Sequence, residues 1–333
     1  MNLNDVLRQV SRTFALSAEE LPGALRNPLT ISYLLLRVSD CIEDSPDMDP
    51  ERKAAHLRTW AAVLREEVAP SALTSQIQDL DPVDPEVYVA QNADWVINEL
   101  HQLPEAIRIP ITERVIETSL GMANWQEHGP YVADEAEMDD YMHYVAGVVG
   151  YLLTDVFAWY IPPIAERKEQ LMPLAREYGL ALQTVNIIRG MRKDYERGWV
   201  FVPQTFYEPF GLTRDTLFDP ANTEQAVKVV NMLVRKAEGH LWNGISYISA
   251  FPRRHHRVRL AAMWPLLFAV KTLSISKGNA NVILHEAKMG RDQVKQIVLH
   301  TRLLGWSNRW LRHYFRELKD QPPGRLAPVP TLW

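Results

Sequence analysis

Two carboxylates, Asp40 and Asp44, lie four residues apart at the end of an apolar stretch. On an α-helix this spacing places both side chains on one face. Like charges there oppose helix formation, so the flanking apolar residues must hold the helix in a core. Proteins bind Mg²⁺ through one or two carboxylates and share it with a phosphate substrate, and this pair could do so. The alternative is a solvated acidic helix end.

A second polar set lies later in the chain. Gln183, Asn186 and Asp194 follow one another at helical spacing and share one face. Their amide and carboxylate oxygens are hard ligands that suit Mg²⁺. Arg189 and Lys193, in the same stretch, could hold phosphate oxygens beside them. The alternative is an amphipathic helix whose charges lie in water.

Two further segments carry side chains that could contact a substrate. Tyr141 and Tyr144 are one helical turn apart in an apolar segment, where they could stabilise a cation through their ring faces or only hydrogen-bond to neighbours. Near the start, Ser11 and Arg12 precede Phe14 and an apolar run. This hydroxyl and guanidinium could meet an anionic head group, or they could belong to a helix surface.

The composition limits the class of protein. A chain of 333 residues forms one large domain or two, and an apolar fraction of 47% is enough for a sizeable core. The net charge of −5 gives no indication of nucleic-acid binding. Cys41 is the single cysteine, so no disulfide can form within the chain, which fits a reducing cytosol.

The elements that must position these residues are helices. Apolar residues recur at helical spacing over 51–67, 104–125 and 293–318, whereas strand patterns are scarce and 199–203 is the nearest to an extended segment. We therefore expect a single all-α domain over residues 1–318 that encloses a deep central cavity, followed by a flexible, proline-rich tail at 319–333.

The N-terminus lacks the basic and apolar regions of a signal peptide. The longest apolar runs, 144–153 and 260–270, are shorter than the roughly 20 residues of a membrane span. We expect a cytoplasmic protein that is soluble or at most peripheral to a membrane. The basic cluster at 253–259 could touch anionic lipid head groups, or it is a solvated helix start.

Taken together, these segments resemble the squalene/phytoene synthase family in type and order over roughly residues 8–315. Residues 40–44, with Arg37 before them, are similar to the family's first aspartate-rich motif. Residues 141–150 resemble its Tyr-x-x-Tyr-Val-Ala-Gly-x-Val-Gly signature, in a form similar to squalene synthases. The family's Ser-Arg-x-Phe segment resembles residues 11–14, and its second aspartate-rich motif resembles residues 183–194. Its late Lys-x-x-Arg element resembles residues 288–291.

The resemblance implies an isoprenoid synthase fold in which two aspartate-bearing helices face each other across a cavity, with Mg²⁺ bridging them to a diphosphate. The family joins two prenyl diphosphates head to head through a cyclopropyl intermediate, which squalene synthases then reduce with NADPH. We expect farnesyl diphosphate to be converted to presqualene diphosphate and squalene. A phytoene-type reaction on geranylgeranyl diphosphate, another terpene product, and a non-catalytic assembly or lipid-binding relative are the alternatives.

The site residues that follow from the spacing and the resemblance fall into three groups. The expected metal ligands are Asp40, Asp44, Gln183, Asn186 and Asp194. The expected diphosphate-binding residues are Ser11, Arg12, Phe14, Arg37, Arg189, Lys193, Lys288 and Arg291. The expected catalytic residues are Tyr141 and Tyr144, together with Asp40 and Asp44.

The sequence departs from the family's second motif at three positions. Gly190 stands where the family usually has an aspartate, Lys193 replaces an often acidic residue, and Trp199 follows Gly198 where an arginine is usual. We hypothesise that Lys193, with Arg192, partly substitutes for one metal ion by neutralising diphosphate oxygens. Gly190 would also let a bulkier substrate or Trp199 approach the helix backbone. The sequence leaves open the substrate chain length, NADPH use and oligomeric state.

Overall fold

The structure, a computed structural model, describes residues 2–286 and 288–321, without the side chain of Arg12. These residues form helices and no strand, apart from an isolated bridge between Tyr131 and Val200. The predicted all-α class is therefore confirmed. The chain divides into two compact units, the first comprising residues 1–129 and 147–172 and the second comprising 130–146 and the residues from 173 onward. The single domain over 1–318 stays a prediction, and residues 322–333 of the predicted tail lie outside the described residues.

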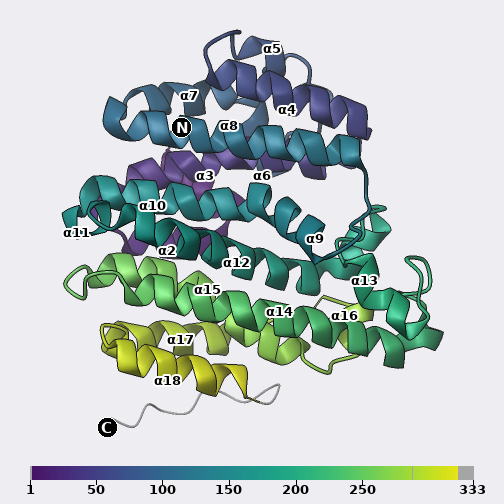
Figure 1. The fold of residues 1–333 in the computed structure, drawn as a ribbon. Helices are drawn as coiled ribbons and strands as arrows, with labels where there is room; N and C mark the ends of the chain where they lie inside the picture. The colour runs from purple at the N-terminus through teal and green to yellow at the C-terminus, as the bar shows by residue number, and fades with distance from the viewer. Residues whose placement is uncertain (1, 287, 322–333) are drawn as a thin grey trace. The chain divides into compact units, whose positions relative to one another are not determined.

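The first unit is built around one long helix, α8, against which α3, α4 and α10 pack (Figure 1). A buried hydrogen bond of 2.9 Å between the hydroxyls of Ser39 and Ser119 joins α3 to α8. The helices that lie within this unit are α1 (Leu3–Val10), α2 (Arg12–Glu20), α3 (Gly23–Asp44), α4 (Pro50–Leu64), α5 (Ser71–Thr74), α6 (Pro85–Gln91), α7 (Ala93–His101), α8 (Glu105–His128), α10 (Val148–Tyr160) and α11 (Pro162–Ala165).

Local sequence sets the beginnings of several helices. The Asp49 side chain accepts a 2.8 Å hydrogen bond from the backbone N–H of Arg52, and Pro50 occupies the first turn, so α4 begins there. Asp134 caps α9 (Glu135–Met142) in the same way, by accepting hydrogen bonds from the backbone N–H groups of Ala136 and Glu137. The predicted helices over 51–67 and 104–125 correspond to α4 and α8.

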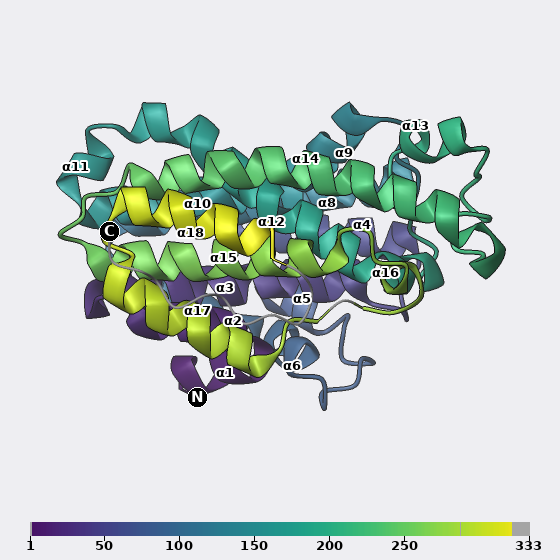
Figure 2. The same cartoon turned by 90° about the horizontal axis from the view of Figure 1, so that it is seen from below.

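The second unit contains four long helices, α14, α15, α17 and α18, that lie side by side (Figure 2). Its elements are α9 (Glu135–Met142), the π-helix η1 (His143–Gly147, whose last residue belongs to the first unit), most of α12 (Lys168–Glu196), α13 (Gln204–Tyr207), the 3₁₀ turns η2 (Glu208–Phe210) and η3 (Pro220–Asn222), α14 (Thr223–Ser249), α15 (His256–Ser276), α16 (Asn281–Leu284), α17 (Arg291–Leu304) and α18 (Asn308–Lys319).

Helix α15 is the core helix of the second unit. Among the described helices it alone is long and apolar enough to cross a membrane, but 89% of its most apolar window is buried inside the protein. Its composition is therefore explained by packing against α14, α17 and α18.

The segment 293–318, whose period is helical throughout, forms two helices, α17 and α18, which are separated by Gly305, Trp306 and Ser307. A Cβ atom at position 305 would lie 2.5 Å from the carbonyl oxygen of Thr301 and 3.0 Å from the sulfur of Met263 on α15. Glycine thus lets the end of α17 pack closely on α15. Ser307 then caps α18 by accepting a hydrogen bond from the backbone N–H of Trp310.

Candidate active site

The carboxylate pair lies in the last turn of α3. Asp44 is exposed and Asp40 is partly buried, and this turn contains no basic residue. The C-terminal end of a helix carries a partial negative charge, which disfavours carboxylates there. A cation bound to the pair would relieve this repulsion, so the arrangement fits a cation site better than a structural role.

Arg37 holds Asp40 from one turn earlier on α3. Its guanidinium lies 3.1 Å from the Asp40 carboxylate and 3.5 Å from Glu86 on α6. Burial raises the pKa of Asp40 to about 6, Asp44 and Glu86 add to the rise, and Arg37 opposes it. Burial alone would lower the pKa of Arg37, but the carboxylates of Asp40 and Glu86 and the phenol of Tyr33 raise it above its ordinary value. Sequence reasoning missed Glu86, because no local pattern marks a residue from another helix.

The segment near the N-terminus contacts the aspartate helix through aromatic rings. The rings of Phe14 and Tyr33 stack with centroids 4.3 Å apart, and the Tyr33 hydroxyl accepts a 2.8 Å hydrogen bond from Arg37. The Ser11 hydroxyl caps α2 by accepting a hydrogen bond from the backbone N–H of Phe14. The structure therefore brings Ser11, Phe14, Arg37 and Asp40 into one neighbourhood of the first unit. The predicted role of the Arg12 side chain lies outside the described residues.

Helix α12 carries the second predicted ligand set. Asn186 is exposed and donates a hydrogen bond of 3.4 Å to the side-chain oxygen of the half-buried Gln183. Lys193 is exposed and follows Asn186 by two helical turns, so both lie on the same face as Gly190. Asp194 ends this face and forms an ion pair of 2.6 Å with Arg197. Arg197 was missed in the sequence, although its spacing of three from Asp194 is a recognisable helical pair.

Arg192 does not share this arrangement. Its guanidinium lies 2.8 Å from Glu196 and contacts the carbonyl of Phe218 at 3.5 Å. In this structure Arg192 contacts Glu196 and the Phe218 carbonyl and not Lys193. That Arg192 and Lys193 together neutralise diphosphate oxygens stays a prediction.

Gly190 and Trp199, two of the departures from the family pattern, are not in contact. Among the described residues, a Cβ atom at position 190 would meet only the Asp194 carboxylate, at 3.6 Å, so Trp199 does not fold back onto the glycine. The Trp199 ring instead stacks on Phe201, whose other neighbour is the ring of Tyr141 at 4.3 Å. Trp199 thus extends an aromatic stack that buries the predicted catalytic Tyr141.

The two tyrosines are joined by a change of helix type. Tyr141 lies in the last turn of α9, and Tyr144 lies in the π-helix η1. The sequence predicted an ordinary helix with the tyrosines one turn apart, and the wider π turn corrects this. Such turns are rare and occur most often at functional sites, because the extra residue re-aims the side chains around it.

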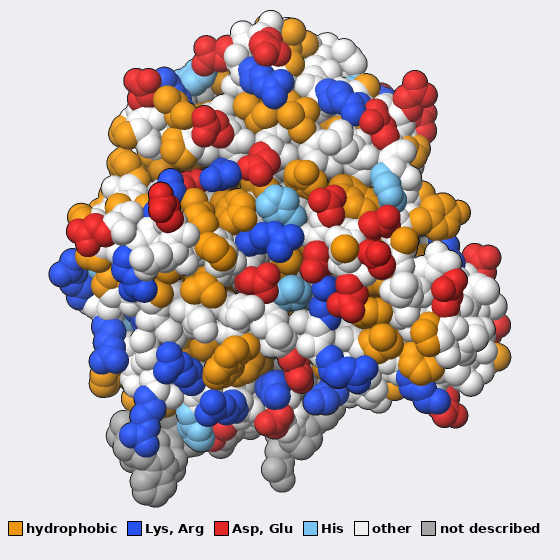
Figure 3. Space-filling model, viewed as in Figure 1, with side chains coloured by type: hydrophobic (Ala, Val, Ile, Leu, Met, Phe, Trp, Pro, Cys, Tyr) orange, Lys and Arg blue, Asp and Glu red, His pale blue; other side chains and the backbone are white. Residues whose placement is uncertain are grey.

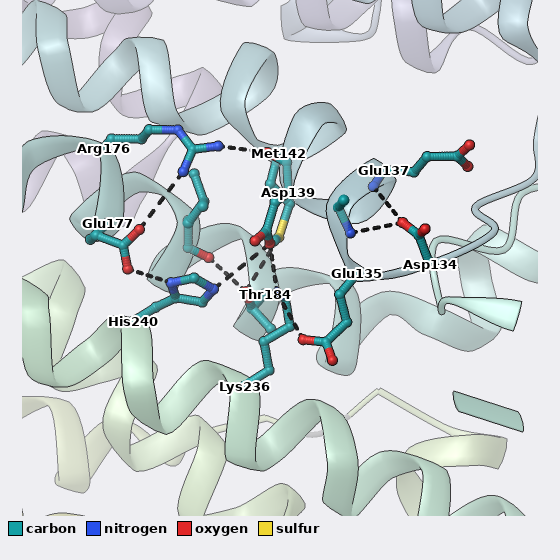
Figure 4. A network of polar contacts seen from close by, with 12 residues as sticks. Asp134, Glu135, Glu137, Asp139, Met142, Arg176, Glu177, Thr184, Lys236 and His240 are labelled. Carbon is teal, nitrogen blue, oxygen red and sulfur yellow. Dashed lines mark hydrogen bonds and ion pairs between the residues drawn. The ribbon is translucent and has the colours of Figure 1, made fainter. Parts of the chain in front are cut away.

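A polar network braces the start of this π-helix (Figure 4). Arg176 on α12 donates to the ring nitrogen Nδ1 of His143 at 3.3 Å and to the backbone carbonyl of Asp139 at 3.2 Å. The Asp139 carboxylate lies 2.6 Å from the nearly buried amino group of Lys236 on α14. His143 and Asp139 are thereby fixed on either side of Tyr141.

The network continues along α12 and α14. His240 Nδ1 lies 2.7 Å from the Glu177 carboxylate, which also accepts a 3.0 Å hydrogen bond from Asn243. The hydrogen bond with His240 is the largest cause of a Glu177 pKa lowered to about 2, burial opposes it, and Asn243 adds to the lowering. The spacing of Lys236, His240 and Asn243 by four and three residues marks one face of α14, which is the sequence signal for this network.

The late predicted cations share a carboxylate with α12. Glu286 lies 3.2 Å from Arg189 and 2.9 Å from Lys288, so two of the predicted diphosphate-binding residues meet at one anion. Arg291 is exposed at the start of α17. All three cations are partly or fully exposed, and such ion pairs exchange readily with other anions.

The donor set fits Mg²⁺ bound together with a phosphate substrate. Within residues 2–286 and 288–321, no group of three or more Asp, Glu, His or Cys side chains is gathered to hold a metal. The first unit offers the pair Asp40 and Asp44, and the second offers Asp194 with the amide of Asn186. Mg²⁺ usually takes one or two carboxylates and completes its shell with water and substrate phosphates. The prediction that the two ligand sets face each other across a cavity stays a prediction.

Comparison with known proteins identifies the family. Residues 7–291 match the family described as squalene/phytoene synthase. This chain belongs to the squalene/phytoene synthase family. The squalene synthase of Homo sapiens is 27% identical over 320 residues, which cover 95% of this chain and 73% of that protein.

Solved structures agree with this assignment to the squalene/phytoene synthase family. The complex of TcSQS with the ligand E5700 has a TM-score of 0.83 and 26% identity, and the match covers 98% of this chain and 92% of that one. A dehydrosqualene synthase in complex with a ligand shares the fold. It is 18% identical, with a TM-score of 0.66, and the match covers 94% of this chain and 96% of that one. The chain is thus a prenyltransferase of a family of metal-dependent enzymes that act on prenyl diphosphates.

Proposed function

We propose that this chain condenses two farnesyl diphosphates head to head, in a Mg²⁺-dependent reaction, to presqualene diphosphate and reduces that product to squalene with NADPH. The observation that carries the proposal is the carboxylate pair at the end of α3, held by Arg37 in a chain whose family match runs over residues 7–291. The similarity to squalene synthases supports the choice of product.

The residues would divide the work according to their chemistry. Asp40, Asp44, Asn186 and Asp194 would hold Mg²⁺, with Gln183 hydrogen-bonded to Asn186. The chemistry that bound Mg²⁺ supplies is neutralisation of the charge on the leaving diphosphate. Arg37 orients Asp40 from within the same helix.

The exposed cations would bind diphosphate oxygens. Arg189 and Lys288 can exchange the Glu286 carboxylate for phosphate oxygens, which bear more charge, and Lys193 and Arg291 would add further contacts. The Tyr141 ring is buried with one face stacked on Phe201, which leaves its other face for a cation, whereas Tyr144 in the π-helix is the more accessible ring. Either ring would stabilise a carbocation electrostatically.

The test is an incubation of purified protein with farnesyl diphosphate and Mg²⁺, with and without NADPH. Released diphosphate is quantified and the extracted lipids are identified. Squalene formed only with NADPH is the expected result. Another lipid would redirect the proposal to a phytoene-type or different terpene product, and geranylgeranyl diphosphate is then the substrate to try. Failure to release diphosphate from either substrate would contradict the proposal.

The Asp40→Asn variant tests the carboxylate pair directly. It keeps the shape of the side chain but removes the charge, so we expect diphosphate release to fall by roughly 10³-fold, as for loss of one important electrostatic group. Asp47→Asn, an exposed carboxylate shortly after α3, is the matched control and should retain activity. Equal rates in the two variants would remove Asp40 from the site.

A further inference from the structure

The C-terminal half of the chain has an uneven charge distribution. The chain has a net charge of −5, yet residues 239–285 contain six Lys or Arg and no Asp or Glu. Residues 293–316 contain five more Lys or Arg and again no acidic residue. Positive charge is therefore concentrated in the part of the second unit that is built from the end of α14, α15, α17 and α18.

The fold brings the α14–α15 and α17–α18 connections, which lie within these two stretches, to one end of the helices. Arg259, which is buried, donates to the carbonyls of Ile248 and Phe251 at 2.9 Å and to the side chain of Asn308 at 2.6 Å. Asn308 in turn donates to the carbonyl of Ser249 at 2.8 Å. The α14–α15 and α17–α18 connections are thus fastened together, and Figures 1 and 2 show both at the same end of the four helices. Arg259 is buried, so neither of the two readings of residues 253–259, lipid contact or a solvated helix start, holds for this residue.

Beside these connections lies an apolar stripe that the rest of the described protein leaves uncovered. Leu299, Leu303 and Trp306 are 56%, 62% and 49% exposed. The spacing of four residues places Leu299 and Leu303 on one side of α17, while Ile297 and His300 face inward. Trp306 lies in the turn that follows the end of α17. Large apolar side chains that cluster on a surface indicate an interaction site more than single ones do.

Exposed arginines flank the stripe. Arg253 and Arg254 lie in the α14–α15 connection, and Arg309 lies in the first turn of α18, shortly after Trp306. Within the part of the chain that the structure describes, none of these three guanidinium groups pairs with a carboxylate. On the face drawn in Figure 3, Lys and Arg side chains also gather along the lower edge, where α18 lies. We call the stripe and these three arginines the α17 surface.

We propose that the α17 surface docks this protein onto a lipid bilayer that contains anionic lipids. Binding to such a membrane uses apolar side chains that insert at the boundary between head groups and acyl chains, and cations that contact the anionic head groups. The two leucines and the tryptophan would supply the first, and the arginines that pair with no carboxylate would supply the second. The complementarity favours this surface, because the protein as a whole is acidic whereas residues 239–285 and 293–316, which build this end of the second unit, contain no acidic residue. The proposal does not depend on the product formed, but an enzyme with prenyl substrates gains access to apolar molecules at a membrane.

Vesicle co-sedimentation tests this proposal. The intact protein is mixed with vesicles of phosphatidylcholine alone or with one third phosphatidylglycerol, at 0.1 M and 0.5 M salt. We expect binding to the mixed vesicles at low salt, weaker binding at high salt, and little binding to phosphatidylcholine. Absence of binding to the mixed vesicles, or equal binding to both kinds, overturns the proposal.

Two double variants assign the binding to the surface. Leu303→Glu with Trp306→Glu should weaken vesicle binding by at least tenfold. Val68→Glu with Val83→Glu is the matched control, since both valines are exposed and the charge change is the same. Arg253→Gln with Arg254→Gln should weaken binding by about 30-fold, from roughly 1 kcal/mol for each arginine.

Thermal unfolding and diphosphate release in vesicle-free buffer serve as controls and should not change in any of these variants. Equal vesicle binding by the Leu303/Trp306 variant and the valine control contradicts the assignment. Analytical ultracentrifugation tests whether a second copy of this chain covers the surface instead of a membrane. If the wild type is a dimer that does not bind vesicles, and the Leu303/Trp306 variant is a monomer, the surface is a contact between two copies and the lipid proposal is wrong.

Discussion

At the scale of single residues, the candidate site is defined by which charges are already neutralised inside the protein. Asp40 is held by Arg37, and Asp194 by Arg197. Lys193 is exposed on the same face of α12 as Asn186. The second ligand set thus has one carboxylate fewer and one ammonium more than the family pattern, which makes it a weaker site for a cation and a better one for an anion.

Replacing Gly190 by aspartate tests this charge balance. A Cβ atom fits at position 190, because among described residues it meets only the Asp194 carboxylate at ordinary contact distance. The change also removes the helix penalty of glycine. We expect Gly190→Asp to fold normally and to lower the Mg²⁺ concentration for half-maximal diphosphate release by roughly tenfold, or about 1.4 kcal/mol.

The measurement is a Mg²⁺ titration of diphosphate release at saturating substrate. Gly190→Asn is the control, since it adds nearly the same side chain without charge and should leave the Mg²⁺ requirement near that of the wild type. A Gly190→Asp enzyme with an unchanged Mg²⁺ requirement would show that residue 190 does not face the metal.

At the scale of elements, the predicted catalytic tyrosines depend on contacts that α9 makes with α12 and α14. Arg176 holds both the last turn of α9 and the first residue of the π-helix. Lys236 and His240 face this network from α14, where their side chains are largely shielded from water. A charged network in such surroundings stabilises one arrangement strongly, because breaking it leaves unpaired charges out of water.

The Glu177–His240 pair predicts a specific pH dependence of stability. The pKa of Glu177 falls from its ordinary value of 4.5 to about 2, so the folded protein binds this proton more weakly than the unfolded chain does. Its stabilising contribution, about 3 kcal/mol at most, is therefore complete above pH 4.5 and is lost as the pH falls towards 2.

Urea unfolding at several pH values between 6 and 3 measures this effect. Glu177→Gln should be destabilised by roughly 2 kcal/mol at pH 6, and its difference from wild type should shrink as the pH falls. Glu169→Gln, an exposed glutamate on the same helix, should follow the wild-type curve. A constant difference between Glu177→Gln and wild type across this range would show that the Glu177 charge does not carry the effect.

At the scale of the whole molecule, the predicted oxygen ligands are divided between the two compact units. The first unit carries Asp40 and Asp44, and the second carries Asn186 and Asp194. Neither set alone has enough ligands for tight binding of Mg²⁺, which prefers six oxygens in octahedral geometry. The metal should therefore bind firmly only when diphosphate supplies the missing oxygens.

Thermal unfolding tests whether Mg²⁺ binding depends on diphosphate. Mg²⁺ alone should hardly change the melting temperature, whereas Mg²⁺ with inorganic diphosphate should raise it by roughly 4 °C or more when both are well above their dissociation constants. A chelator should abolish the increase, and Asp40→Asn should reduce it. A full increase with Mg²⁺ alone would contradict the expectation and indicate a complete protein site.

Much of the fold and part of the site could be predicted from the sequence, because a helix leaves a periodic pattern of apolar residues within a short stretch of the chain. Apolar residues at spacings of three and four predicted α4 and α8, and the same geometry placed Asp40 with Asp44 and Asn186 with Asp194. The order of the motifs, which needs no structure, indicated the family that the comparisons then established.

Contacts between helices required the tertiary structure. Glu86 beside Arg37, Phe201 between Tyr141 and Trp199, and the burial of Arg259 join residues that are far apart in the chain or lie on different elements. No periodicity encodes such pairs, since they depend on how side chains fill the space between packed helices. The amino-acid order thus determined the helices, their polar faces and the family, whereas packing decided which charges are paired, which rings are buried and which apolar stripe stays exposed.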